Sequence, residues 1–139
     1  MVNPLQIYEI LSEFYEKPDW WPAETPFEVV VGAILTQNTN WNNVEKAIAN
    51  LRCADVLTSS AILQIEREEL EQLIRPSGFF RQKAERLQLF CHYLHQHYQG
   101  SLEKLLQREI TLVRDELLSL KGIGPETADS ILLYAGQRP

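Results

Sequence analysis

The chain has 139 residues, a length typical of a single domain. Apolar residues make up 45% of it and charged residues 23%, a composition that can form a buried core and excludes a disordered or low-complexity protein. The formal net charge of −6 argues against a protein that coats nucleic acid through bulk positive charge.

Cysteine content and hydropathy argue against a secreted protein, a membrane protein and a thiolate metal site. The two cysteines, Cys53 and Cys91, are too few for a disulfide framework or a thiolate metal cluster. The longest apolar run, residues 29–35, is too short to span a bilayer, and no secretory signal is seen at the N-terminus. We therefore expect a cytoplasmic protein that has no membrane partner and no metal site.

Charge is unevenly distributed along the chain. Residues 1–28 contain six acidic residues and one basic residue, whereas residues 75–86 contain four basic residues and one acidic residue. Any surface that binds nucleic acid is therefore expected near residues 75–86.

The spacing of apolar residues predicts helices along the whole chain and no strand. A first helix begins at Pro4 and is followed by a loop over residues 17–24. Thr25-Pro26-Phe27-Glu28 is a capping box with proline at the first helical position. The helix that it opens is apolar on every side through Leu35, which predicts a buried, central helix.

Further helices are expected in the rest of the chain. The predicted set comprises a helix capped by Asn40 or Thr39, two short helices around Ala61 and over residues 70–74, a long helix from Phe80 to Gly100, helices capped by Ser101 and by Thr111, and a last helix that begins at Pro125.

A very short hairpin joins the last two of these helices. Its sequence over residues 120–128 is LKGIGPETA, in which Gly122 and Gly124 flank one apolar residue, Ile123. Each glycine allows a positive φ and a close approach of the backbone to a partner. The N–H groups at the start of the next helix can bind a phosphate oxygen. The pattern favours a phosphate site made by the backbone, although a tight turn that binds nothing also fits Gly-Ile-Gly alone.

Three motifs together resemble the endonuclease III-like DNA glycosylases. The hairpin is similar to that family's helix-hairpin-helix motif. Residues 27–40, FEVVVGAILTQNTN, resemble its buried helix with a glutamine at the end, and residues 78–84, GFFRQKA, resemble its Gly-Leu-Tyr-x-x-Lys-Ala stretch. Residues 18–22, PDWWP, are more particularly similar to the 3-methyladenine DNA glycosylases.

The resemblance implies a fold and a function. It implies an all-α helix-hairpin-helix glycosylase fold, with a six-helix domain over residues 25–139. Residues 1–24 would supply an N-terminal helix and a pocket loop of a second lobe. Its members flip a damaged base out of duplex DNA and cleave the N-glycosidic bond in base excision repair. An alkylated base is the expected substrate.

The resemblance also assigns roles to individual residues. Gln37 is expected to fill the gap left by the flipped nucleotide, and Phe79 to wedge into the base stack. The residues expected to contact the DNA backbone are Lys83, Lys121, Gly122, Ile123 and Gly124. Those expected to line the base pocket, where aromatic faces stack on an electron-poor purine, are Trp20, Trp21 and Pro22.

Two departures from the family pattern bear on activity. Glu126 stands where bifunctional members carry a lysine that attacks the sugar, so a monofunctional glycosylase is expected. The family's catalytic aspartate is expected beyond Pro139, in a C-terminal lobe that would also carry any iron–sulfur cysteines. The chain is therefore expected to bind DNA, associated with the nucleoid when bound, but to be catalytically incomplete and to hold no cofactor. Surface left by the absent lobe would favour self-association.

Other interpretations remain for each feature. Gln37 could be a polar residue that ends a buried helix, Phe79 a core aromatic residue, and the two tryptophans a closure of the core. The basic residues of 75–86 could form a solvated helix face. The function could instead be that of a non-catalytic DNA-binding module or of a helical protein–protein interaction domain.

Overall fold

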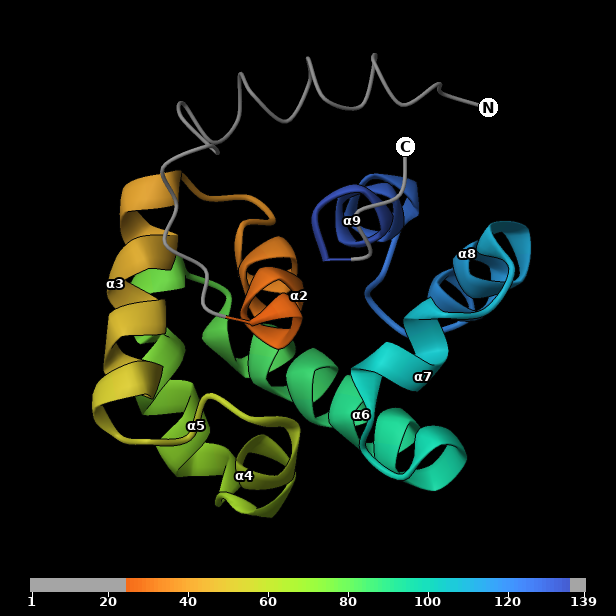
Figure 1. Ribbon diagram of the computed structural model, residues 1–139. Helices are drawn as coiled ribbons and strands as arrows, with labels where there is room; N and C mark the ends of the chain where they lie inside the picture. The colour runs from red at the N-terminus through yellow and green to blue at the C-terminus, as the bar shows by residue number, and fades with distance from the viewer. Residues whose placement is uncertain (1–24, 136–139) are drawn as a thin grey trace.

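The computed structural model describes residues 25–135, which form helices and contain no strand (Figure 1). The α-helices are α2 (Pro26–Leu35), α3 (Trp41–Cys53), α4 (Ser59–Gln64), α5 (Arg67–Ile74), α6 (Phe80–Tyr98), α7 (Leu102–Leu106), α8 (Ile110–Leu118) and α9 (Pro125–Ser130). A 3-10 turn, Arg75–Ser77, precedes α6, and a wider π-helical turn, Ile131–Ala135, follows α9. The all-α prediction is confirmed. The predicted first helix, and with it the division at residue 24, lies outside the described residues.

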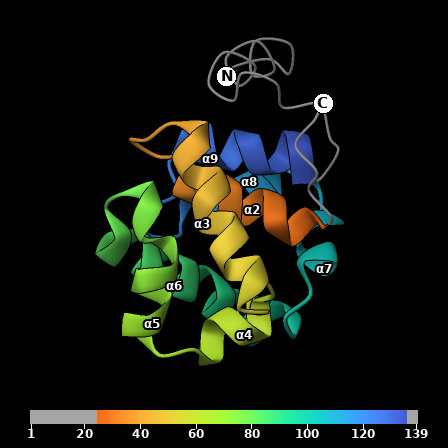
Figure 2. The ribbon, with the colours of Figure 1, turned by 90° about the vertical axis from the view of Figure 1, so that its left-hand side faces the viewer.

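Helix α2 is the centre of the bundle, as its apolar sequence predicts. It lies between α3 and α9 in Figure 1, passes behind α3 in Figure 2, and also contacts α6. Thr25 caps it, because its Oγ1 accepts a hydrogen bond from the Glu28 N–H at 3.2 Å. The buried Glu28 carboxylate pairs with Arg52 of α3 at 2.5 Å, which ties the start of α2 to its neighbour.

Side-chain caps mark the starts of α3, α4, α7 and α8, and one of these caps differs from the prediction. Asn40 caps α3 by accepting from the Asn43 N–H, and Ser101 caps α7 by accepting from the Lys104 N–H. Helix α8 starts two residues earlier than a cap at Thr111 would place it, because the Glu109 carboxylate accepts from the Leu112 N–H. The Thr111 hydroxyl also donates to this carboxylate, so the threonine lies inside the first turn.

Helix α6 is the long element against which α2, α4, α5 and α7 pack. Its inward face carries the apolar residues that the sequence predicts, namely Ala84, Leu87, Phe90, Cys91 and Leu94. One charged residue, Lys83, also lies on that face and is buried. Within residues 25–135, no helix is both long and apolar enough to cross a bilayer.

Candidate nucleic-acid interface

The hairpin between α8 and α9 needs glycine at only one of its two glycine positions. Gly122 has a φ of +85°, and a Cβ built there would lie 2.2 Å from Cδ of Arg86. Gly124 caps α9 with an extended backbone, φ −90° and ψ −178°, and a Cβ there would meet nothing within 4 Å. Both glycines allow a positive φ, but only Gly122 has one, because extended geometry suits Gly124 at the start of a helix.

The rest of the hairpin has one buried residue, which packs into the core, and several exposed residues. Ile123 is buried, and its N–H donates to the Leu120 carbonyl, so the turn is fixed from inside. Gly124, Pro125 and Glu126 are exposed. The Lys121 side chain is 67% exposed and pairs with Glu85 of α6 at 3.0 Å. Backbone and one cation are thus presented to solvent at the same edge.

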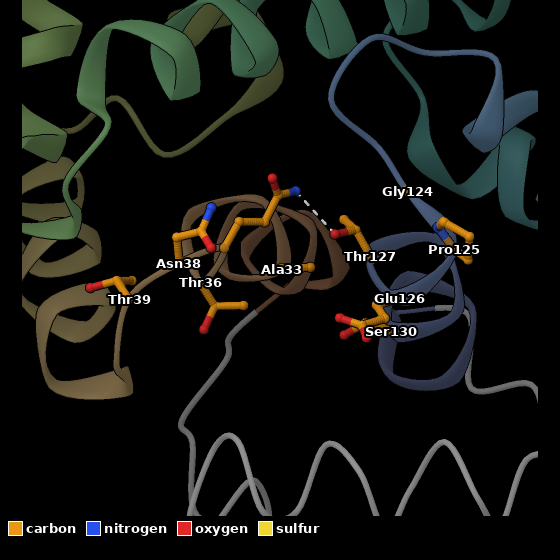
Figure 3. A pocket seen from close by; sticks show the side chains of 10 residues that line it. Ala33, Thr36, Asn38, Thr39, Gly124, Pro125, Glu126, Thr127 and Ser130 are labelled. Atoms are coloured by element: carbon orange, nitrogen blue, oxygen red, sulfur yellow. Dashed lines mark hydrogen bonds between the residues drawn. The ribbon is translucent and has the colours of Figure 1, made fainter.

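Gln37 joins the turn after α2 to this hairpin. Its Nε2 donates to the Gly122 carbonyl and to Thr127 Oγ1, each at 3.0 Å, and the dashed line at Thr127 in Figure 3 is the second of these bonds. Arg86 Nη1 of α6 donates to Gln37 Oε1 at 3.0 Å. One amide group therefore connects three segments that are far apart in sequence.

Phe79 stands at the start of α6 in a strained conformation. Its φ of +46° is in the left-handed region, directly after Gly78 at +75°, and the residue is 57% exposed. The interpretation of Phe79 as a core aromatic residue is wrong, because Phe80 packs against the core instead. The guanidinium groups of Arg75 and Arg81 lie 5.3 and 5.5 Å from the Phe80 ring centroid. A non-glycine residue held in left-handed geometry with an exposed ring is typical of a functional position.

Lys83 does not reach the surface, contrary to the prediction that it contacts phosphate. The residue is 1% exposed, and its Nζ donates to the carbonyls of Leu35 at 2.7 Å and Ser77 at 2.8 Å. Burial, with a smaller effect from the charge of Arg86, lowers the pKa of Lys83 to about 8. The physical reason is helix phase, since Lys83 lies one turn before Leu87 on the inward face of α6.

A cleft of about 620 Å³ lies between the end of α2 and the start of α9. Figure 3 shows Glu126 and Ser130 next to each other on α9 and Thr36 across from them. The lining residues are Ala33, Thr36, Gln37, Asn38, Thr39, Gly124, Pro125, Glu126, Thr127 and Ser130. The volume is in the range of small-molecule sites, and the side chains in it are mostly polar.

The sequence missed Arg86 and Thr127 as parts of this site. Arg86 lies three residues after Lys83, and side chains at this spacing are neighbours on a helix. This spacing could have indicated that Arg86 lies near the site. Thr127 belongs to the hairpin motif but gave no sign of a side-chain partner. Asp129 is buried against Arg114 of α8 at 2.8 Å, so its carboxylate is used in an ion pair. Trp20, Trp21 and Pro22, the predicted base pocket, lie outside the described residues.

Comparison with known proteins gives the family. The sequence profile described as "HhH-GPD superfamily base excision DNA repair protein" matches residues 31–128. The chain is 50% identical over 135 residues to a Methanocaldococcus jannaschii protein whose name assigns it provisionally to the DNA repair glycosylases, and 33% identical over 114 residues to endonuclease III of Thermotoga maritima. These alignments cover 96% and 82% of the chain but 61% and 49% of the two relatives.

Solved structures agree with this assignment. The Helicobacter pylori 3-methyladenine DNA glycosylase, bound to 1,N6-ethenoadenine, matches with a TM-score of 0.77 and 35% identity over 99% of this chain and 66% of that chain. A non-covalent endonuclease III–DNA complex matches with a TM-score of 0.69 and 29% identity over 97% of this chain and 61% of that chain. The chain thus spans about half to two thirds of the proteins that it matches. It belongs to the HhH-GPD superfamily of base excision DNA repair proteins.

Proposed function

We propose that the protein recognises a damaged, alkylated base in duplex DNA and removes it as a monofunctional DNA glycosylase. The observation that carries the proposal is the junction formed by Gln37, Gly122 and Thr127 beside the cleft. The junction brings the motif at the end of α2 into contact with the hairpin, while Phe79 stands exposed at the start of α6. Family membership supports the repair function, and the protein is an all-α member.

On this proposal the DNA backbone is bound mainly by the hairpin. The residues that would bind it are Lys121, Gly122, Ile123 and Gly124, through peptide groups and one exposed ammonium. Peptide N–H groups bind phosphate without requiring positive net charge, which suits a chain of net charge −6.

Gln37 and Phe79 would act on the base stack. Phe79 has the exposed apolar ring that a wedge requires, and its backbone is in left-handed geometry at the start of α6. Gln37 would enter the gap left by the flipped nucleotide. In the DNA-free protein its amide bonds to Gly122, Thr127 and Arg86, so insertion exchanges these three bonds for bonds to the bases.

We propose that Trp20, Trp21 and Pro22 line the base pocket. Aromatic faces attract a cationic, alkylated purine, and the Glu126 carboxylate in the cleft adds a negative charge. The 3-methyladenine DNA glycosylase of Helicobacter pylori, which this chain resembles in structure, was solved with 1,N6-ethenoadenine bound. Duplex DNA that carries a damaged base is therefore the partner that we propose.

The chemistry would be hydrolysis without a covalent intermediate. Glu126 has no amine with which to form a Schiff base. We propose that an aspartate beyond Pro139 supplies the carboxylate that stabilises the cationic sugar and orients water. An iron–sulfur cluster does not fit the thiols of this chain, because two cysteines cannot supply four thiolates and burial raises the pKa of Cys91 to about 12.

Duplex binding by Gly124→Val tests the proposed backbone contact. The variant should fold, since its φ of −90° suits a side chain and a Cβ meets no protein atom within 4 Å. The new side chain should block the approach of a phosphate and weaken binding tenfold or more, which corresponds to about 1.4 kcal/mol.

Ser60→Val, on an exposed position of α4, is the matched control and should bind as the wild type does. Binding should be measured by fluorescence anisotropy at several salt concentrations, because phosphate contacts are sensitive to salt. If Gly124→Val binds duplex as well as the wild type, the hairpin is only a turn between two helices.

A further inference from the structure

Lys83 is a buried cation that the proposed DNA contacts do not use. A charged side chain with 1% exposure is rare, because removing an ammonium from water is unfavourable unless strong partners replace the water. Here the partners are two carbonyl oxygens, of Leu35 and Ser77, at 2.7 and 2.8 Å. These carbonyls belong to segments that are about forty residues apart in the sequence.

Each of the two carbonyls lies just before a residue that is proposed to act on the base stack. Leu35 is the last residue of α2, two positions before Gln37. Ser77 ends the 3-10 turn, two positions before Phe79. One ammonium group therefore bonds both backbone segments immediately upstream of the two probing side chains.

Both segments also pack against α3, and Lys83 adds a direct bond between them. The Leu35 carbonyl is among the last carbonyls of α2, which have no partner within the helix. The turn that contains Ser77 leads directly into two residues of positive φ, Gly78 at +75° and Phe79 at +46°. A short cross-link between a helix end and a strained turn limits how far either can move. The lowered pKa of Lys83, near 8, is consistent with an ammonium held in a dry site.

We propose that Lys83 is a positioning residue, which fixes the distance between the Gln37 turn and the Phe79 turn so that both side chains reach the same step of the duplex. The inference rests on the proposed function. It assigns Lys83 no contact with DNA, so loss of its ammonium should separate two properties. Unstacking of bases should fall strongly, whereas affinity for duplex, which depends on the hairpin, should change little.

The experiment measures both properties on one DNA probe with the full chain at pH 7. The probe is a duplex with a tetrahydrofuran abasic-site analogue next to 2-aminopurine, whose fluorescence rises when stacking is lost. Anisotropy on the same probe gives the affinity. Lys83→Met keeps most of the side-chain volume and removes both hydrogen bonds. We expect it to reduce the fluorescence gain at saturation at least fivefold and the affinity by no more than about threefold.

A second variant separates positioning from general stability. Leu105→Ala removes buried contacts in α7 and should lower the melting temperature without changing the Leu35 and Ser77 carbonyls, so it should keep the full fluorescence gain. Lys46→Met, exposed on α3, controls for the loss of one positive charge. If Lys83→Met does not fold, Lys83→Arg serves instead. Its longer, planar group cannot hold both carbonyls at the same spacing, and the fluorescence gain should again fall more than the affinity.

The outcomes distinguish this inference from the proposed function. The positioning role is overturned if folded Lys83 variants give the same fluorescence gain as the wild type. It is also overturned if the gain and the affinity fall by the same factor, or if Leu105→Ala reduces the gain as much as the Lys83 variants do. A wild-type chain that binds the probe without unstacking it, or that does not bind, overturns the proposed function and this inference with it.

Discussion

The two glycines of the hairpin offer a matched test of which position the fold requires. Gly122→Ala places a Cβ at a φ of +85°, which costs about 1–2 kcal/mol for an L-residue. The same Cβ would lie 2.2 Å from Arg86 Cδ, so the arginine must move and lose its bond to Gln37. A hydrogen bond from a charged donor contributes roughly 1.5–3 kcal/mol. The unfolding free energy should therefore fall by about 2.5–5 kcal/mol.

Gly124→Ala should behave differently although it is two residues away. Its φ of −90° is open to alanine, and the Cβ meets nothing within 4 Å. Loss of a glycine N-cap and the smaller entropy of the unfolded chain act in opposite directions, each by up to about 1 kcal/mol. The net change should stay within about 0.5 kcal/mol.

Urea unfolding followed by circular dichroism measures both changes. A third variant isolates the contact with Arg86. In an Arg86→Ala background the clash is gone, so Gly122→Ala should cost only the left-handed penalty of about 1–2 kcal/mol. If Gly124→Ala costs as much as Gly122→Ala, the reasoning from backbone geometry is refuted. If the cost of Gly122→Ala is the same in both backgrounds, its packing against Arg86 has no energetic role.

Two further predictions concern charge and chemistry. Folding lowers the pKa of Lys83 from its usual 10.5 to about 8, so between these pH values the unfolded chain binds more protons. The wild type should then gain stability relative to Lys83→Met as pH rises from 8 to 10, by about 2 kcal/mol; a constant difference in urea midpoints over this range would contradict the shift. On the proposed monofunctional chemistry, with Glu126 at the position of the lysine nucleophile, borohydride should trap no covalent DNA complex, even with a longer chain that releases 3-methyladenine; a trapped complex would refute that chemistry.

The central part of the fold could be predicted because its signals are local. Thr25 and Pro26 mark a helix start through groups only three residues apart, and the unbroken apolar run to Leu35 leaves no polar face to expose. Lys83 was predicted wrongly, because its charge was given more weight than its helix phase. Its spacing from Leu87 and Phe90 already placed it on the inward face.

The hydrogen bonds of the site could not be predicted from local sequence signals. The bond between Gln37 and Gly122 joins residues 85 positions apart, and that between Arg86 and Gln37 spans 49 positions. The extended backbone of Gly124 had a local signal, because the residue precedes Pro125 and caps α9. The motifs indicated which segments matter, but only the packing of α6 against both segments showed how they meet.

The bonds from Gln37 to the hairpin also set an order in which the protein can assemble as it is synthesised. Gly122 and Thr127 leave the ribosome long after Gln37, because 85 residues separate Gln37 from Gly122. At translation rates of about 5–20 residues per second, that delay is roughly 4–17 s. During this time α2 lacks its α9 neighbour, and its apolar side that will face α9 is uncovered. The nascent chain therefore depends on α3 and α6 to cover the rest of α2, and the cleft is among the last parts of residues 25–135 to form.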